Sequence, residues 1–347
     1  MKAKVHDKRE VIAITMGDPA GVGSEIIIKA LGRMEVYEIS IPIVIGDYEA
    51  LYDAIRFCNS NLRLNEITDP DDALGEYGTV DFIDLKYLSK DGWDYKKNSK
   101  VCGEASFNYI IYAIRLATEN RVSAVVTAPI SKESINLAGH HYSGHTEIFA
   151  EYTSTNKYAM LLASKNIRVI HVSTHVSLRE ACRRVKKGRI LEVIELADEG
   201  ARLLDIKKPK IAVAGLNPHC SENGLFGTEE VNEIMPAIEA AKRKGIDVVG
   251  PESPDTVFTK CAGGQYDIVV AMYHDQGHIP LKLNGFNLSK DGSESVSGIN
   301  CTIGLPIVRT SVDHGTAFGK AGEGRANEES MIDAIEAGVL MAKNRRS

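Results

Sequence analysis

Residues 11–33 read VIAITMGDPAGVGSEIIIKALGR, and they join a short β-branched run to an apolar helical pattern through a glycine-rich turn. The run 11–15 predicts a buried strand, and the pattern 22–33 predicts a helix. Glycine tolerates the backbone angles of a tight strand-to-helix turn, so the connecting segment 15–25 suits that role. Repeated along a chain, such a unit builds a parallel sheet.

The same alternation recurs on both sides of this stretch. Further strands are predicted at 41–45, 80–85, 122–127, 159–163, 168–173, 210–215, 267–272 and 302–309, and helices at 103–119, 131–137, 191–204, 228–244 and 327–343. Near-continuous apolar strands are typical of a sheet covered by helices on both faces. We therefore expect an α/β fold with right-handed crossovers and mostly parallel strands. No low-complexity linker marks a domain boundary.

Composition narrows the class of protein. A chain of 347 residues is long enough for two α/β domains. The 41 basic and 47 acidic residues give a net charge of −6, which does not favour a nucleic-acid partner. No apolar run approaches the ~20 residues of a membrane span, and the N-terminus has no signal-like apolar stretch. Six scattered cysteines without a CxxC pair indicate reduced thiols, so we expect a cytoplasmic protein without membrane or nucleic-acid partners.

The basic run 183–189 (RRVKKGR) lies in helix-like sequence that reaches Gly188. We interpret it as a solvated helix end rather than as a targeting signal.

Three histidines each follow a predicted strand. His175 comes after 168–173, His219 after 210–215, and His274 after 267–272. Ligand sites of open α/β sheets gather at the carboxyl ends of strands. Three neutral imidazoles converging there would form an open metal site that favours Zn, Co, Ni or Fe(II) over Mg. On the residues alone, separate roles as helix caps or turn residues are equally open.

The spacing of His171 and His175 suggests a second metal pair that the strand pattern excludes. On a helix these two residues could share an ion. The segment 168–174 is β-like, however, and at ~3.3 Å per residue it places the two rings roughly 13 Å apart. We therefore interpret His171 as structural.

The remaining polar segments carry weaker signals. The segment 15–25 is neither a P-loop nor a GxGxxG fingerprint, and a structural turn or an anion site suits it equally. Lys132, Lys282 and Arg309 lie near predicted strand ends. Arg309 stands in the apolar stretch 304–310, where an unpaired charge would be costly, so it is the strongest anion-binding candidate of the three. The glycine-punctuated loop 313–324 could wrap a nucleotide.

Together these segments resemble the 4-hydroxythreonine-4-phosphate dehydrogenase family from about residue 11 to residue 342. The resemblance is carried by ITMGDPAGVGSE (14–25), VVTAPISKESIN (125–136), GHTEIFAE (144–151), STHVSLRE (173–180), GLNPHCSENGLFGTEE (215–230), PDTVF (254–258), AMYHDQG (271–277) and GLPIVRTSVDHGTAF (304–318).

The resemblance implies a fold similar to isocitrate and isopropylmalate dehydrogenases, with two α/β/α domains around a mostly parallel sheet rather than a dinucleotide-binding domain with GxGxxG. It implies a homodimer with active sites shared between subunits. We expect the first domain to comprise 1–130 plus 312–347. The second, 131–311, would carry the metal ligands and the dimer contacts.

The resemblance also implies roles for individual residues. His175, His219 and His274 would bind a divalent metal (Zn, Co or Mg, with Zn preferred by imidazole ligands). NAD would lie on the loop that follows the last strand, although NAD cannot be told from NADP. The substrate residues would be His145, Thr146, Lys282, Asn300 and Arg309, and the NAD contacts Asp313, His314, Gly315 and Thr316.

The implied reaction is oxidation of a 4-phosphorylated hydroxy acid followed by loss of CO2, with Lys282, Asp255 and Asp275 as candidate proton carriers. The segment 274–282 (HDQGHIPLK) and the ending TAF at 316–318 resemble the branch that converts D-threonate or D-erythronate 4-phosphate to dihydroxyacetone phosphate. The biosynthetic substrate 4-phosphooxy-L-threonine, of the route to pyridoxal phosphate, is the alternative. A dihydrodiol-carboxylate dehydrogenase, a metal lyase or aldolase without NAD, and a non-catalytic metabolite-binding protein are further alternatives.

Two segments depart from the family pattern. Gly319 and Lys320 replace an acidic–apolar pair that is common in relatives, which leaves details of the cofactor contact open. The stretch 284–298 is longer and more polar than its counterpart, so we expect a mobile loop there.

Overall fold

The computed structural model describes residues 9–288, 294–296 and 298–346. It divides the chain into two compact units, residues 1–153 with 306–347 and residues 154–305. Residues 131–153 and 306–311, which the sequence prediction places in the second domain, belong to the first unit. No helix of the described residues is both long enough and apolar enough to cross a membrane.

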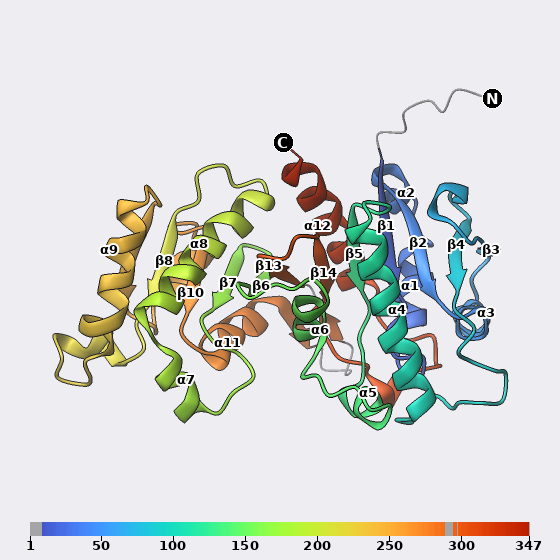
Figure 1. Cartoon of the computed structure of the whole chain (residues 1–347), viewed down its shortest axis with the longest axis horizontal. Coiled ribbons are helices and arrows are strands. Elements are labelled where there is room, and N and C mark those ends of the chain that lie inside the picture. Colours follow the sequence, from blue (N-terminus) through green and yellow to red (C-terminus); the bar gives the residue numbers. More distant parts are fainter. Residues whose placement is uncertain (1–8, 289–293, 297, 347) are drawn as a thin grey trace. The chain divides into compact units, whose positions relative to one another are not determined.

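The first unit is built on a fully parallel sheet (Figure 1). The strand order is β3-β4-β2-β1-β5-β14. The strands are β1 (Glu10–Thr15), β2 (Ser40–Gly46), β3 (Arg63–Glu66), β4 (Thr79–Asp84), β5 (Ala124–Thr127) and β14 (Arg309–Val312). The helices are α1 (Gly23–Ala30), α2 (Met34–Ile39), α3 (Tyr48–Phe57), α4 (Lys100–Thr118), α5 (Lys132–Leu137), α6 (His145–Tyr152) and α12 (Glu329–Arg345), with short 3-10 turns at Pro70–Asp72 and Phe318–Lys320.

The second unit has a mixed sheet with strand order β13-β6-β7-β10-β8-β9. Its strands are β6 (Ala159–Ser164), β7 (Ile167–His171), β8 (Ile211–Ala214), β9 (Val248–Glu252), β10 (Ile268–Ala271) and β13 (Ile299–Ile303). The helices are α7 (Leu178–Arg184), α8 (Lys187–Leu203), α9 (Met235–Arg243), α10 (Val257–Ala262) and α11 (His274–Gly285), with a 3-10 turn at Pro218–Glu222 and a π-helical turn at Glu230–Ile234. Strands β7, β10, β8 and β9 are parallel, whereas β6 is antiparallel to both of its neighbours.

Side-chain alternation gives the second sheet two covered faces. Leu162 and Val169 belong to a buried cluster that also contains Phe258 of α10 and Leu281 of α11. Leu161 points the other way, and a Cβ on Gly200 of α8 would lie 2.8 Å from it. Burying one such aliphatic side chain contributes about 1.5–3 kcal/mol, so packing on both faces fixes the strand ends that carry the polar residues.

The α/β class and the mostly parallel sheet are confirmed, and two local predictions, on the strand 302–309 and on the basic run 183–189, are wrong. The expected strand 302–309 is two strands, because Gly304 takes a left-handed φ of 94° and Pro306 follows it. Strands β6 and β7 are antiparallel, because only Lys165 and Asn166 connect them and a parallel crossover needs a much longer connection. The basic run does not end a helix at Gly188, since α7 stops at Arg184 and α8 starts at Lys187.

The predicted mobile loop 284–298 is described only in part. Its ends form the antiparallel strands β11 (Phe286–Leu288) and β12 (Glu294–Val296). Residues 289–293 and 297 lie outside the described residues, and the prediction of mobility falls largely on them.

Two helical glycines should respond in opposite directions to alanine. A Cβ on Gly103 of α4 would lie 1.9 Å from the Ser134 carbonyl oxygen of α5, whereas Gly188 of α8 has nothing within 4 Å. Alanine normally stabilises a helix by up to about 1 kcal/mol over glycine. We expect Gly188→Ala to raise the free energy of unfolding by up to about that much, and Gly103→Ala to lower it by about 2 kcal/mol or more through overpacking. Urea unfolding of both variants checks this, and a stabilised Gly103→Ala would contradict the close packing of α4 on α5.

Candidate active site

The three candidate metal ligands follow three neighbouring parallel strands of the second unit. His175 comes four residues after β7, His274 begins α11 three residues after the end of β10, and His219 lies in the turn after β8. Because β7, β10 and β8 are adjacent and parallel, their carboxyl ends meet at one edge of the sheet.

His175 and His274 lie close together at this edge. Their ring centroids are 5.8 Å apart, and both residues line a cavity of about 610 Å³. The Nδ1 atom of His274 is 2.6 Å from a carboxylate oxygen of Asp275. A carboxylate only accepts, so Nδ1 carries the proton and the Nε2 lone pair is left available as a metal ligand.

His274 is also the end of a column of aromatic rings. The ring of His278, one turn further along α11, stacks on it at 3.6 Å with an interplanar angle of 13°. The Nδ1 atom of His278 donates to the His274 carbonyl oxygen over 2.9 Å. The His171 ring follows at 4.8 Å from His278. His171 ends β7 and is buried, in keeping with its interpretation as a structural residue.

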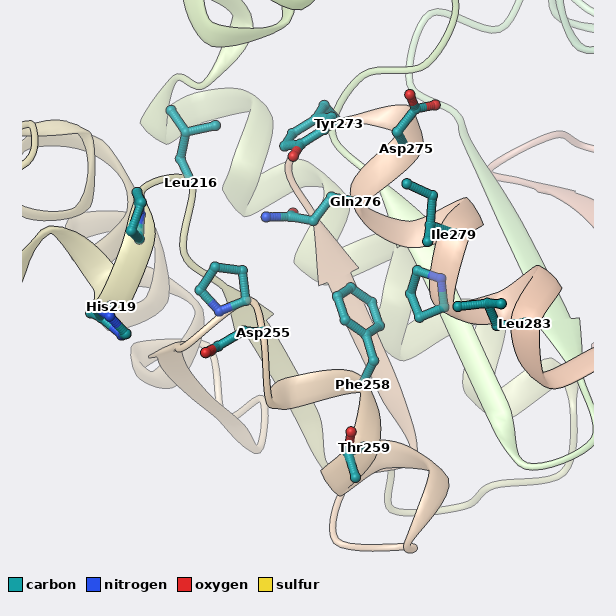
Figure 2. A pocket seen from close by; sticks show the side chains of 13 residues that line it. Leu216, His219, Asp255, Phe258, Thr259, Tyr273, Asp275, Gln276, Ile279 and Leu283 are labelled. Carbon is teal, nitrogen blue, oxygen red and sulfur yellow. The ribbon is translucent and has the colours of Figure 1, made fainter.

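His219 lines a neighbouring cavity of about 730 Å³ together with Asp255, Tyr273, Asp275 and Ile279. Figure 2 shows His219 and Asp255 on one side of it and the α11 residues Asp275 and Ile279 on the other. The two cavities share Tyr273, Asp275 and Ile279 in their walls, so they adjoin.

The residue types at this edge of the sheet suit a divalent metal, but their positions suit it only in part. Zn–N bonds are about 2.0–2.1 Å long, and two rings 5.8 Å apart are near enough for both to reach one ion. The described residues contain no group of three His, Cys, Asp or Glu side chains placed to hold an ion. His219 therefore stands apart from His175 and His274 here, and the three-histidine centre stays a prediction.

The candidate proton carriers of this unit differ in their surroundings. The Ser253 hydroxyl donates to Asp255 over 2.7 Å and lowers its pKa, and nearby His219 contributes further. Asp255 is therefore an anion in the working range of most enzymes. Lys282 is exposed on α11, eight residues after His274 and four after His278, so it lies on the same face of the helix as both.

The first unit places His145 and Arg309 together. Arg309 is buried at the start of β14, its Nη2 donates to the Thr127 hydroxyl over 2.8 Å, and its guanidinium lies 5.7 Å from the centre of the Phe149 ring. His145 begins α6, and its buried Nε2 has no hydrogen-bond partner among the described residues. Burial holds the pKa of His145 well below its ordinary value, with a further contribution from Arg309. Thr146 is next to it and half-buried.

Asn300 belongs to the second unit. It lies on β13, and its Nδ2 atom is 3.2 Å from the Met160 sulfur. The predicted substrate residues are thus divided, with His145, Thr146 and Arg309 in the first unit and Lys282 and Asn300 in the second.

The predicted NAD contacts, Asp313–Thr316, form the loop after β14. The backbone N–H of Val22 donates to the Thr316 carbonyl oxygen over 3.0 Å, and a Cβ on Gly21 would lie 2.9 Å from that oxygen. The glycine-rich turn of residues 15–25 therefore packs against the loop. A Cβ on Gly315 would have nothing within 4 Å, so its backbone is open to a ligand that approaches closely. This opening suits a dinucleotide held by main-chain contacts.

Sequence reasoning left two members of the ring column without a role at the site. His278 lies four residues after His274, a spacing that brings side chains together on a helix. That spacing is the only sequence signal for the stack, and it applies only on a helix, whereas Gly277 and Pro280 lower the helix propensity of residues 274–285.

Burial of neutral His171 should make the second unit sensitive to acid. Burial lowers the pKa of His171 to about 3, with a smaller contribution from His278. Folding lowers the pKa of such a histidine, so the free energy of unfolding has its full value only above the unfolded-state pKa of about 6.5. Below that pH the unfolded state binds a proton that the folded state does not, and the free energy of unfolding falls by about 1.4 kcal/mol per pH unit. We expect wild type to lose about 2 kcal/mol more than His171→Leu between pH 7 and pH 5, measured by urea unfolding. Parallel pH profiles would contradict the burial of a neutral ring.

Comparison with known proteins assigns the family. The family model "Pyridoxal phosphate biosynthetic protein PdxA" matches residues 38–338. D-threonate 4-phosphate dehydrogenase from Cupriavidus necator is 43% identical over 342 residues, which cover 98% of this chain and all of that one. The crystal structure of 4-hydroxythreonine-4-phosphate dehydrogenase from Klebsiella pneumoniae is 43% identical, with a TM-score of 0.85 over 97% of this chain and 99% of that one.

A terephthalate 1,2-cis-dihydrodiol dehydrogenase from Burkholderia xenovorans is more distant, at 27% identity and a TM-score of 0.66, and covers 96% of this chain and 98% of that one. The match to the family model and the full-length relatives agree with the α/β architecture described above. This chain belongs to the PdxA family of dehydrogenases.

Proposed function

We propose that this protein is a NAD-dependent and divalent-metal-dependent dehydrogenase that converts D-threonate or D-erythronate 4-phosphate to dihydroxyacetone phosphate and CO2. The observation that carries the proposal is that His175, His219 and His274 each follow one of three adjacent parallel strands of the same sheet. The 43% identity to a D-threonate 4-phosphate dehydrogenase along the whole chain supports the choice of substrate.

The overall reaction is an oxidation at C3 followed by cleavage of the C1–C2 bond. The C3–H bond breaks and its hydride reduces NAD, while the C3 hydroxyl loses its proton, which gives a β-keto acid. The C1–C2 bond then breaks, CO2 leaves, and C2 takes up a proton to give dihydroxyacetone phosphate. His175, His219 and His274 would hold a divalent ion, which would supply Lewis acidity at the substrate oxygen.

Residues of the second unit would handle the protons. We assign Lys282 as the principal proton carrier, because it is an exposed amine on the same face of α11 as His274. Asp275 fixes the tautomer of His274 through its 2.6 Å contact with Nδ1. Asp255 is held as an anion by Ser253 and would attract positive charge beside His219.

Residues of the first unit would hold the anionic substrate and the cofactor. Arg309 offers a planar guanidinium suited to a phosphate or carboxylate, and neutral His145 with Thr146 offers hydrogen bonds beside it. Asn300 of the second unit would add a further polar contact. The open backbone at Gly315, within Asp313–Thr316, would contact NAD.

We further infer a cytoplasmic homodimer whose subunits share active sites. Each of the six cysteines, all of them among the described residues, is a free thiol, which supports a reducing compartment.

A second candidate is oxidation of 4-phosphooxy-L-threonine in pyridoxal phosphate biosynthesis. It is supported by the family description and by the name of the Klebsiella pneumoniae structure. The name of the Burkholderia xenovorans structure makes dihydrodiol carboxylates a third, weaker candidate because its identity is only 27%.

The substrate assignment is tested by steady-state NADH formation at 340 nm. The substrates to compare are D-threonate 4-phosphate, D-erythronate 4-phosphate and 4-phosphooxy-L-threonine. Each should be assayed with Zn, Co and Mg supplied in turn. We expect kcat/KM to be at least about tenfold higher for one of the two sugar acids, which corresponds to about 1.4 kcal/mol of transition-state discrimination. A higher value for 4-phosphooxy-L-threonine would establish the biosynthetic activity instead. Metal binding with no NADH from any acid would indicate a non-catalytic binding protein.

A further inference from the structure

The turn that carries His219 has an unusual backbone. His219, Cys220, Ser221, Glu222 and Asn223 have φ angles of 51°, 55°, 62°, 44° and 59°. The left-handed region costs an L-residue roughly 1–2 kcal/mol, and none of these five is glycine. Runs of such residues persist only where surrounding contacts hold them, and they gather at functional sites.

A buried carboxylate holds the chain just before this turn. Glu230 is 1% exposed, and its Oε1 accepts hydrogen bonds from the backbone N–H groups of Leu216 and Asn217, both at 2.8 Å. Its Oε2 accepts from the Asn217 side-chain amide over 2.9 Å. Burial by itself raises the pKa of Glu230, but the bonds from Asn217 and Leu216 outweigh it, and the pKa lies below its ordinary value. The group is therefore an ionised acceptor that joins residues 216–217 to the following helical segment.

The space around the carboxylate is closely fitted. A Cβ on Gly227 would lie 2.6 Å from the Asn217 Nδ2 atom, and a Cβ on Gly215 would lie 3.3 Å from Glu230 Oε1 and 3.0 Å from the Cys220 sulfur. Glu230 is also the first residue of the π-helical turn Glu230–Ile234. Single π turns are uncommon and are frequent at functional sites.

We propose that Glu230 is a positioning residue, whose carboxylate anchors the left-handed turn and so sets the His219 imidazole at the edge of the cavity that also contains Asp255. Glu230 is not among the residues that line the two cavities, and it acts through Leu216 and Asn217. The inference rests on the proposed function, because it takes His219 to be a metal ligand.

Glu230→Gln tests the proposal with almost no change in side-chain size. The glutamine side chain has one acceptor oxygen where the carboxylate has two. Its N–H groups would face the Asn217 side-chain amide, which is also a donor, so that hydrogen bond is lost. Losing such a supporting contact typically weakens metal affinity by roughly 10–100-fold. We expect that loss for Zn in competition with a chromophoric chelator, together with an altered visible absorption spectrum of the Co-loaded protein. Hydrogen exchange of the backbone amides in 211–224 should become faster in the metal-free variant.

Glu239→Gln is the matched control, because Glu239 is an exposed carboxylate of α9 that pairs only with Lys242 among the described residues. It should bind Zn as wild type does. If Glu230→Gln unfolds, Asn217→Ala removes the side-chain amide that donates to Glu230 Oε2 and leaves the two backbone donors in place, and we expect a smaller loss of roughly 3–10-fold. Zn affinity and backbone hydrogen exchange of Asn217→Ala should be measured in the same way.

His219→Ala distinguishes a failure of the positioning role of Glu230 from a failure of the proposed metal site. If it loses Zn affinity while the folded anchor variants bind Zn as wild type does, the positioning role is overturned and the proposed metal site stands. If His219→Ala itself binds Zn like wild type, the metal site of the proposed function is wrong and the role of Glu230 is overturned with it.

Discussion

His274→Ala should lose metal binding and nearly all turnover. His274 lies at the centre of the site, 5.8 Å from the His175 ring, stacked on His278, and paired through Nδ1 with Asp275. Removing its imidazole would delete one of the proposed metal ligands and the group that Asp275 orients. We expect kcat/KM to fall by roughly 10³-fold or more, which is about 4 kcal/mol of transition-state stabilisation, and the Zn content of the purified protein to fall with it.

The control for this prediction is His141→Ala. His141 is an exposed histidine of the first unit whose ring contacts the Asn136 side chain at 2.9 Å. It should keep wild-type metal content and turnover. Full Zn content measured by atomic absorption in His274→Ala would contradict the assignment of this residue as a ligand.

Arg309→Lys should separate substrate binding from folding. Arg309 is 1% exposed, and its guanidinium donates to the Thr127 hydroxyl and lies over the ring of Phe149. Lysine keeps the charge but lacks the planar fork that binds phosphate or carboxylate with two hydrogen bonds. Loss of a buried charged contact costs about 2–5 kcal/mol, so we expect KM for the phosphorylated acid to rise by roughly 10²-fold or more.

KM and the melting temperature should be measured together for Arg309→Lys. Arg115→Lys, a change to an exposed arginine of α4 that lies over the Tyr112 ring, is the control. We expect the melting temperature of Arg309→Lys to lie within a few degrees of wild type. The control should keep the wild-type KM and the wild-type melting temperature. An unchanged KM would show that Arg309 serves the fold rather than the substrate.

Most of the fold was accessible from the sequence because buried parallel strands are nearly continuous apolar runs. Strands such as Ile211–Ala214 and Ile268–Ala271 are fully buried, and their residue types alone locate them. The antiparallel direction of β6 was not accessible from apolar patterning, since it depends on the two-residue connection at Lys165 and Asn166. Helix α11 was missed because Gly277 and Pro280 lower its helix propensity, and tertiary packing of Leu281 overrides them.

The sequence predicts where the candidate site lies, but it does not predict how the side chains of the site are arranged. Strand ends pointed to His175, His219 and His274, because the topology places the carboxyl ends of parallel strands together. The stack of His278 on His274 depends on the missed helix. The left-handed turn at His219 depends on Glu230, eleven residues later, and no local propensity predicts five successive non-glycine residues with positive φ. The domain boundary lies in ordinary ordered segments near Thr153 and Leu305, without any change in composition.

The most direct test of the proposed function is the rate of NADH formation from D-threonate 4-phosphate before and after metal removal. The protein as purified, the protein stripped with a chelator, and the stripped protein resupplied with Zn or Co should be compared, with dihydroxyacetone phosphate measured in the same samples. The account predicts one dihydroxyacetone phosphate for each NADH, loss of both after stripping, and recovery of both on adding metal back. Full NADH formation by the stripped protein, or NADH without dihydroxyacetone phosphate, would contradict it.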